Sequence, residues 1–220
     1  MSTQIKNVLS AAGMNDIARV NFYNTVPSEA TSPFDCDSET GTGHHGEPIK
    51  QDCQFNRYEV CAMKHVCPTD DLGTCDTASQ LTFSKFVSCA EGEPYAKNGK
   101  LSFVDPPACA KKFFTTDQVS AIEKCAGSTA GGSGDGAEAV TLLSGVTQMW
   151  SKNKPHFAMF PSIIIDGTRC ISCNGSGNLQ SFIQVVCAAY KGSTKPAACA
   201  SALELSPSSS MDDVTIISED

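Results

Sequence analysis

Apolar residues recur at helical spacing along much of this chain. Near the start, the i, i+3, i+4, i+7 pattern of one helix face is made by Ile5, Val8, Leu9 and Ala12. Gly13 follows and is suited to the left-handed residue that ends a helix. Similar patterns predict further helices over residues 53–65, 83–90, 115–126, 137–151 and 179–190. The Thr115 to Gln118 spacing is that of a capping box.

Two segments have strand character instead. Residues 18–23 alternate apolar and polar side chains, which predicts a strand. Residues 157–167 form a β-rich run that ends in Asp166-Gly167, a strong hairpin signal. Between the elements, residues 25–52 and 91–107 are predicted to be loops, and the glycine-rich residues 127–136 a flexible connector. The Ser-rich, acidic residues 201–220 predict a disordered tail.

Composition narrows the class of protein. The chain has 220 residues, which suits one domain with insertions, and 40% of them are hydrophobic, enough for a core. Twelve cysteines favour a bridged fold in an oxidising compartment, although reduced or metal-binding cysteines in the cytosol remain an alternative. The net charge of −8 argues against nucleic-acid partners and anionic membranes. No apolar run approaches the ~18 residues of a membrane span.

The block around Cys53 carries the most specific motif. It consists of His45-Gly46, Asp52-Cys53, Asn56 and Cys61. This block resembles the signature of the gamma-interferon-inducible lysosomal thiol reductases. It differs from that signature in having Gly43 in place of a cysteine and a longer gap before Cys53. Cys36 is a candidate to replace the cysteine missing at Gly43. Cys89, Cys109, Cys125, Cys187 and Cys199 also fall where members of that family carry cysteines.

The resemblance implies a fold and an activity. It implies an α/β, thioredoxin-like domain over residues 1–200, with a helical, disulfide-rich insertion at about 53–150. Residues 160–167 resemble the family's stretch that contains a cis-proline, so Pro161 is the expected cis-proline and substrate-binding residue, with an ordinary trans-proline at a strand start as the alternative. The implied activity is reduction of disulfides in protein substrates, in lysosomes or outside the cell. No cofactor is predicted.

The family's nucleophilic Cys-x-x-Cys is absent from this chain. It would follow the first strand and open the first helix, but here the first helix begins almost at Met1. Residues 1–6 also lack the pattern of a signal peptide. We therefore expect either an N-terminal truncation, which explains both absences, or a true loss of the pair.

One Cys-x-x-Cys does occur, at a position the family does not use. Cys170 and Cys173 follow the predicted hairpin and are the candidate catalytic residues, with a structural bridge as the alternative. The remaining cysteines are candidates for structural disulfides: Cys36, Cys53, Cys61, Cys67, Cys75, Cys89, Cys109, Cys125, Cys187 and Cys199.

Spacing limits how some of these cysteines pair. Cys67 and Cys75 flank a short loop and could bond each other. Eight residues separate Cys53 from Cys61, which is roughly 12 Å along a helix, too far for a disulfide between them. His44, His45 and His65 lie near these cysteines, but the spacing is not that of a zinc site, so no metal is predicted.

Three functions remain open. The first is a thiol reductase whose own nucleophile is missing. The second is a secreted, disulfide-stabilised protein that binds a partner without redox turnover. The third is a reductase that has moved its redox pair to Cys170 and Cys173. Asn174 begins an Asn-Gly-Ser glycosylation sequon, which would be used only in a secreted chain.

Overall fold

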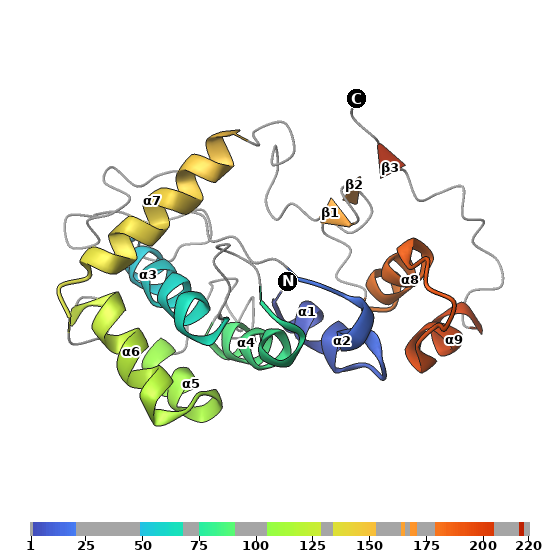
Figure 1. Ribbon diagram of the computed structural model, residues 1–220, viewed down its shortest axis with the longest axis horizontal. Helices are drawn as coiled ribbons and strands as arrows, with labels where there is room; N and C mark the ends of the chain where they lie inside the picture. The colour runs from blue at the N-terminus through green and yellow to red at the C-terminus, as the bar shows by residue number, and fades with distance from the viewer. Residues whose placement is uncertain are drawn as a thin grey trace. The chain divides into compact units, whose positions relative to one another are not determined.

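The computed structural model describes residues 2–20, 49–67, 75–90, 105–128, 134–152, 164–165, 168–170, 179–204 and 216–217 (Figure 1). The chain divides into two compact units. The larger unit is Arg19–Met149, and the smaller combines Thr3–Ala18 with Trp150–Asp220. Each unit has its own hydrophobic core.

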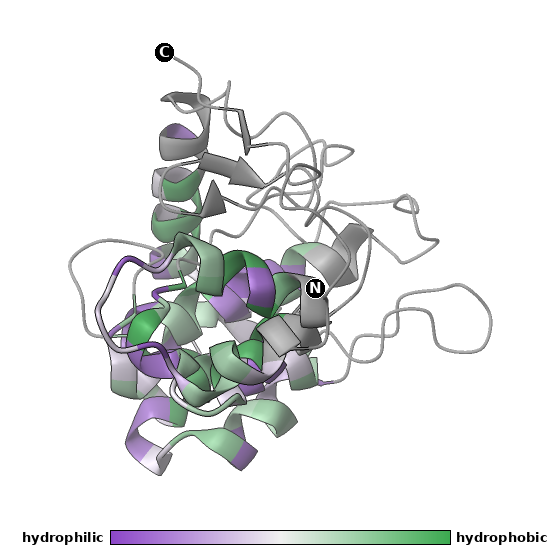
Figure 2. Ribbon diagram, turned by 90° about the vertical axis from the view of Figure 1, so that its right-hand side faces the viewer, coloured by the Kyte–Doolittle hydropathy of each residue, from purple (hydrophilic) through white to green (hydrophobic). Residues whose placement is uncertain are grey.

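The larger unit is built from helices. They are α3 (Ile49–Val66), α4 (Thr77–Ala90), α5 (Pro106–Phe113), α6 (Thr116–Ala126) and α7 (Ala137–Lys152). Helix α3 packs against α4, α5 and α6, and it carries apolar residues from Phe55 to Val66 into the core. Figure 2 shows that helices of the chain carry both apolar and polar residues, as is expected of helices that turn one apolar face to a core.

Aromatic residues hold the centre of this core. The Phe86 ring lies 6.1 Å from the Tyr58 ring, 6.0 Å from the Phe83 ring and 5.0 Å from the Phe114 ring, measured between centroids. Tyr58, Phe83 and Phe86 are fully buried. These three side chains therefore fix α4 against α3 through apolar burial and tilted ring contacts.

Helix ends in this unit follow from local sequence. The Thr115 hydroxyl accepts a hydrogen bond from the Gln118 backbone N–H at 3.3 Å, and the Gln118 side chain accepts one from the Thr115 N–H at 3.0 Å. The predicted capping box is thus confirmed. Helix α5 was not predicted, because a pair of prolines such as Pro106 and Pro107 is typical of loops. Proline suits the first helical turn, where its missing N–H would have no partner.

The smaller unit contains α1 (Ser2–Ser10), α2 (Met14–Ile17), α8 (Leu179–Ala189) and α9 (Ala197–Glu204). Its buried core residues are Val8, Met14, Cys187 and Cys199. Between α1 and α2, Gly13 has a φ of 78°, and a Cβ there would lie 2.9 Å from the Pro196 Cβ. The glycine predicted after the first helix is therefore needed for both its conformation and its contact. Helix α9 also makes residues 201–204, predicted as part of a disordered tail, helical.

The predicted α/β, thioredoxin-like fold is wrong, because the described residues are mainly helical. Extended structure among them is limited to β1 (Ile164–Ile165), β2 (Thr168–Cys170) and β3 (Ile216–Ile217), an antiparallel ribbon in the order β1-β2-β3. Strands of two or three residues cannot form the sheet around which a thioredoxin-like core is built. The helices bury their apolar faces against one another instead.

The two predicted β segments have different outcomes. Ile165 lies opposite Thr168 in the antiparallel pair of β1 and β2, which agrees with the hairpin predicted at Asp166-Gly167. The turn residues themselves lie outside the described residues. In the segment 18–23, residues 18–20 form no strand, and the rest is also outside the described residues.

Candidate functional site

Cysteines join the helices in pairs. Disulfides connect Cys61 to Cys125, Cys67 to Cys75, Cys89 to Cys109, and Cys187 to Cys199, with Cα–Cα distances of 5.8, 4.5, 5.8 and 5.5 Å respectively. Cys53 is disulfide-bonded as well. Cys67 and Cys75 are the pair that the short loop between them suggested. No free cysteine is found in the part of the chain that the structure describes.

Each bridge has a place in the helical packing. Cys61–Cys125 joins α3 to α6, Cys89–Cys109 joins α4 to α5, and Cys187–Cys199 joins α8 to α9. Cys61 and Cys125, which form the first bridge, are 0% and 1% exposed. Sulfurs buried in this way cannot meet the disulfide of another protein, so the Cys61–Cys125 bridge has a structural role in the folded chain.

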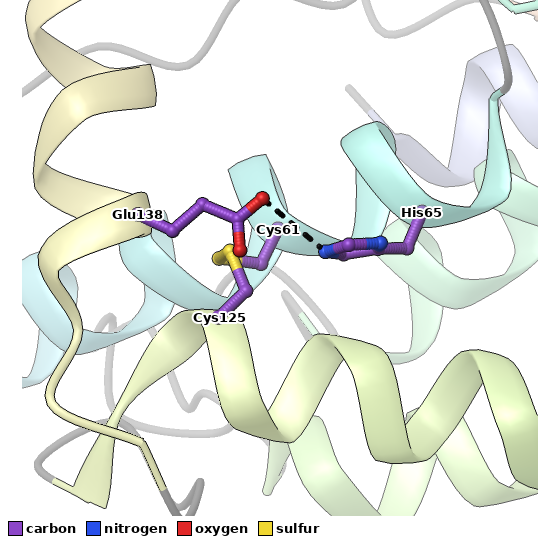
Figure 3. A network of polar contacts seen from close by, with 4 residues as sticks. All are labelled: Cys61, His65, Cys125 and Glu138. Atoms are coloured by element: carbon purple, nitrogen blue, oxygen red, sulfur yellow. Dashed lines mark ion pairs between the residues drawn. A yellow bond between two sulfur atoms is a disulfide. The ribbon is translucent and has the colours of Figure 1, made fainter.

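The densest group of reactive side chains surrounds the Cys61–Cys125 bridge (Figure 3). Cys61 and His65 lie four residues apart on α3 and so share one face of that helix. Cys125 comes from the last turn of α6, and Glu138 from the first turn of α7. The His65 Nε2 atom lies 3.6 Å from a Glu138 carboxylate oxygen. We call Cys61, His65, Cys125 and Glu138 the four-residue cluster.

The chemistry of this cluster depends on the state of its cysteines. Ligand atoms of His65, Cys125 and Glu138 all lie within 4.8 Å of one another. In the disulfide form, however, Cys125 has no thiolate to offer. His65 and Glu138 then remain as a contact between α3 and α7, which is an ion pair only when the imidazole is protonated, and their side chains are 26% and 48% exposed. Such a partly exposed pair stabilises a fold only slightly.

Gly136, which lies just before α7, and Arg57 lie close together near this cluster. Gly136 has a φ of 77°, and a Cβ there would lie 3.1 Å from Arg57 Nη1 and 3.2 Å from the Ala126 carbonyl oxygen. Arg57 is one helical turn before Cys61 on α3 and is 8% exposed. Its guanidinium therefore lies near the C-terminal end of α6, where the helix dipole favours a positive charge.

Tyr58 is the other unusual polar group in this unit. Its side chain is fully buried, and its hydroxyl has no hydrogen-bond partner among the described residues. Burial raises the pKa of the Tyr58 phenol well above its ordinary value, and the negative charges of Glu123 and Asp105 raise it further. A protonated phenol inside an apolar core contributes packing rather than proton transfer.

The structure brings only some of the predicted site residues together. Cys170 is the last residue of β2 and lies opposite Ile216 in the ribbon. Several others lie outside the described residues: Cys36, His44, His45, Pro161, Cys173 and Asn174. The substrate-binding role of Pro161 is not tested by the described residues and stays a prediction.

Sequence reasoning missed the four-residue cluster. The Cys61-x₃-His65 spacing was a visible signal, since it places two ligand types on one helix face. Cys125 and Glu138 were not associated with it, because 64 residues separate Cys61 from its disulfide partner. The packing of α6 against α3 and the His65–Glu138 contact between α3 and α7 bring them together.

Two further findings bear on the class of protein. None of the helices in the described ranges combines the length and the apolar character needed to cross a bilayer. No family model, curated protein or solved structure matches this chain.

Proposed function

We propose that this chain is a thiol–disulfide oxidoreductase that acts on protein disulfides, with Cys170 and Cys173 as its redox pair. The observation that supports this assignment is the pairing of the other cysteines. Eight of them are closed in four bridges within the two helical units, and Cys53 is bonded too. Cys170 and Cys173 form the single Cys-x-x-Cys of the sequence, which is the spacing of dithiol redox centres.

The position of Cys170 is compatible with this chemistry. It ends β2, the second strand of a tight hairpin, and Cys173 follows three residues later. The Cys170 thiolate would attack one sulfur of a substrate disulfide, forming a mixed disulfide and releasing the other sulfur as a thiolate. The Cys173 thiolate would then attack Cys170, releasing the second substrate thiol and leaving a Cys170–Cys173 disulfide. A small dithiol would return the pair to its reduced form.

The resemblance around Cys53 supports the same function. Cys53, Asn56 and Cys61 all lie on α3, and all three are buried. These positions suit a motif that holds the scaffold together rather than one that reacts. The many bridges are expected of a protein that works in an oxidising compartment, lysosomal or extracellular.

A reductase assay tests this proposal. Purified chain, supplied with a dithiol, should accelerate reduction of insulin or a fluorogenic disulfide substrate above the rate of the dithiol alone. Cys170→Ser should abolish the acceleration, because it removes the attacking sulfur. Ser172→Ala keeps both thiols and should retain activity. A parent chain without acceleration, or a Cys170→Ser variant that retains it, would refute the assignment.

A disulfide-stabilised binding protein without redox turnover is the second candidate. The burial of the bridged cysteines favours it, because those of the described residues are buried apart from Cys89, which is half-buried. In that case the parent chain would show no reductase activity although every bridge is formed.

A further inference from the structure

We propose that the four-residue cluster becomes a zinc site when the Cys61–Cys125 disulfide is reduced. The ligands would be the thiolates of Cys61 and Cys125, the His65 Nε2 atom and a Glu138 carboxylate oxygen. This inference concerns the larger helical unit and does not rest on the function proposed for Cys170 and Cys173. It exchanges one crosslink between α3 and α6 for another.

The ligand types and number suit zinc. Zn²⁺ prefers four tetrahedral ligands drawn from cysteine, histidine and carboxylate side chains. In such a site the ligand atoms are separated by about 3.3 to 3.8 Å, as follows from metal–ligand distances of about 2.0 to 2.3 Å. The His65 nitrogen and the Glu138 oxygen are already 3.6 Å apart. The Cys125 sulfur is within 4.8 Å of both, and Cys61 is its disulfide partner, so all four proposed ligands start close together.

His65 points its Nε2 atom into the cluster, toward Glu138 (Figure 3). Its Nε2 atom is buried and has no hydrogen-bond partner among the described residues apart from the ion-pair contact with Glu138. A buried nitrogen without a hydrogen bond is unfavourable, and a metal would supply the missing interaction. The same atom is the one that histidine commonly offers to zinc.

Nearby charge balances the site. Two thiolates and one carboxylate bring three negative charges to Zn²⁺, which leaves the site with a net charge of −1. The Arg57 guanidinium lies one turn before Cys61 on the same face of α3, beside Gly136. A positive charge at that place would offset the excess negative charge in a partly buried site.

The redox step balances as a two-electron exchange. A dithiol reductant passes two electrons and two protons to the Cys61–Cys125 disulfide and becomes a disulfide itself. Zn²⁺ then displaces the two thiol protons. A disulfide oxidant reverses the exchange by accepting two electrons from the two thiolates and releasing the metal.

Alkylation mapped by mass spectrometry tests the site directly. The full chain is reduced with a dithiol, exchanged into buffer with or without Zn²⁺, treated with iodoacetamide and digested. Zinc should slow labelling of Cys61 and Cys125 at least tenfold. Cys67, Cys75, Cys89 and Cys109 are internal controls, whose labelling should be the same with and without zinc. Equal labelling of Cys61 and Cys125 with and without zinc would overturn the proposal. This holds also if the chain unfolds on reduction, because no zinc site would then form.

Zinc affinity of the reduced chain gives a second readout. His65→Ala and Glu138→Gln should each weaken zinc binding by about 10- to 100-fold or more, since even outer partners of metal ligands have effects of that size. Lys64→Ala and Asp117→Asn are the matched controls, because both residues are exposed and lie outside the cluster. The oxidised parent should bind no zinc here. Unchanged affinity in His65→Ala would place the metal on other thiols and overturn the proposal.

Discussion

At the scale of single residues, a buried phenol is the most informative group in the larger unit. Tyr58 contributes its ring to the aromatic core beside Phe86, while its hydroxyl has no hydrogen-bond partner among the described residues. A buried donor without an acceptor lowers stability by about 1 to 3 kcal/mol. The Tyr58 ring therefore stabilises the core, whereas its hydroxyl lowers the stability of the folded state.

Tyr58→Phe should leave the free energy of unfolding at pH 7 unchanged or raise it by about 1 kcal/mol, because it removes only the unsatisfied hydroxyl. Urea denaturation checks this value. Tyr190→Phe, at a half-buried position after α8, is the matched control and should change stability little. A loss of more than about 1 kcal/mol in Tyr58→Phe would mean that the hydroxyl has a hydrogen-bond partner.

The same substitution should alter the response to alkaline pH. The pKa of Tyr58 is raised in the folded chain, so the folded state holds the phenol proton more tightly than the unfolded state does. The stability that the protonated Tyr58 phenol contributes is fully present below the pKa of about 10 that tyrosine has in the unfolded chain, and it is lost as the pH rises above that value. Tyr58→Phe should therefore lose less stability than the parent above pH 10.

At the scale of elements, helix existence could be predicted from the sequence, because its signals are local. The capping pair Thr115 and Gln118 marked the start of α6, and Gly127 marked its end with a φ of 84°. Helix α5 was missed where its two prolines resembled a loop. The four-residue cluster was missed for another reason: it joins three helices, and no local pattern specifies which helix faces which.

Thr115→Ala should lower the free energy of unfolding of the larger unit by about 1 kcal/mol, since it removes the side-chain acceptor for the Gln118 N–H. The neighbouring Thr116→Ala makes the same chemical change one residue inside the helix and serves as the control. Thermal or urea unfolding followed by circular dichroism measures both. Equal effects of the two substitutions would show that the capping box adds nothing to stability.

At the scale of the whole molecule, the sequence predicted the longer helices correctly, missed the shorter α2, α5 and α9, and gave the wrong architecture. The α/β expectation rested on the order of elements and on the resemblance around Cys53, neither of which measures strand length. The described strands have at most three residues, too few for a sheet that forms a core. Helices such as α3 and α6 bury their apolar faces against each other, and this packing replaces the expected sheet.

The disulfides differ in how much they constrain the chain. Loop closure by Cys61–Cys125, across 64 residues, stabilises the fold by about 4 kcal/mol in the chain-entropy model, against about 2.5 kcal/mol for the eight-residue Cys67–Cys75 loop. Among the bridges of the larger unit whose two cysteines are both described, the Cys61–Cys125 bridge closes the longest loop and therefore constrains the unfolded chain most. It is also the bridge that the proposed zinc site would replace.

Disulfide mapping of the native protein by mass spectrometry tests the central claim most directly, namely that the cysteines of the helical units are closed in fixed structural bridges. Digestion without reduction should yield peptides linked through Cys61–Cys125, Cys67–Cys75, Cys89–Cys109 and Cys187–Cys199. Free thiols at these eight positions, or Cys61 linked to any cysteine other than Cys125, would contradict the account.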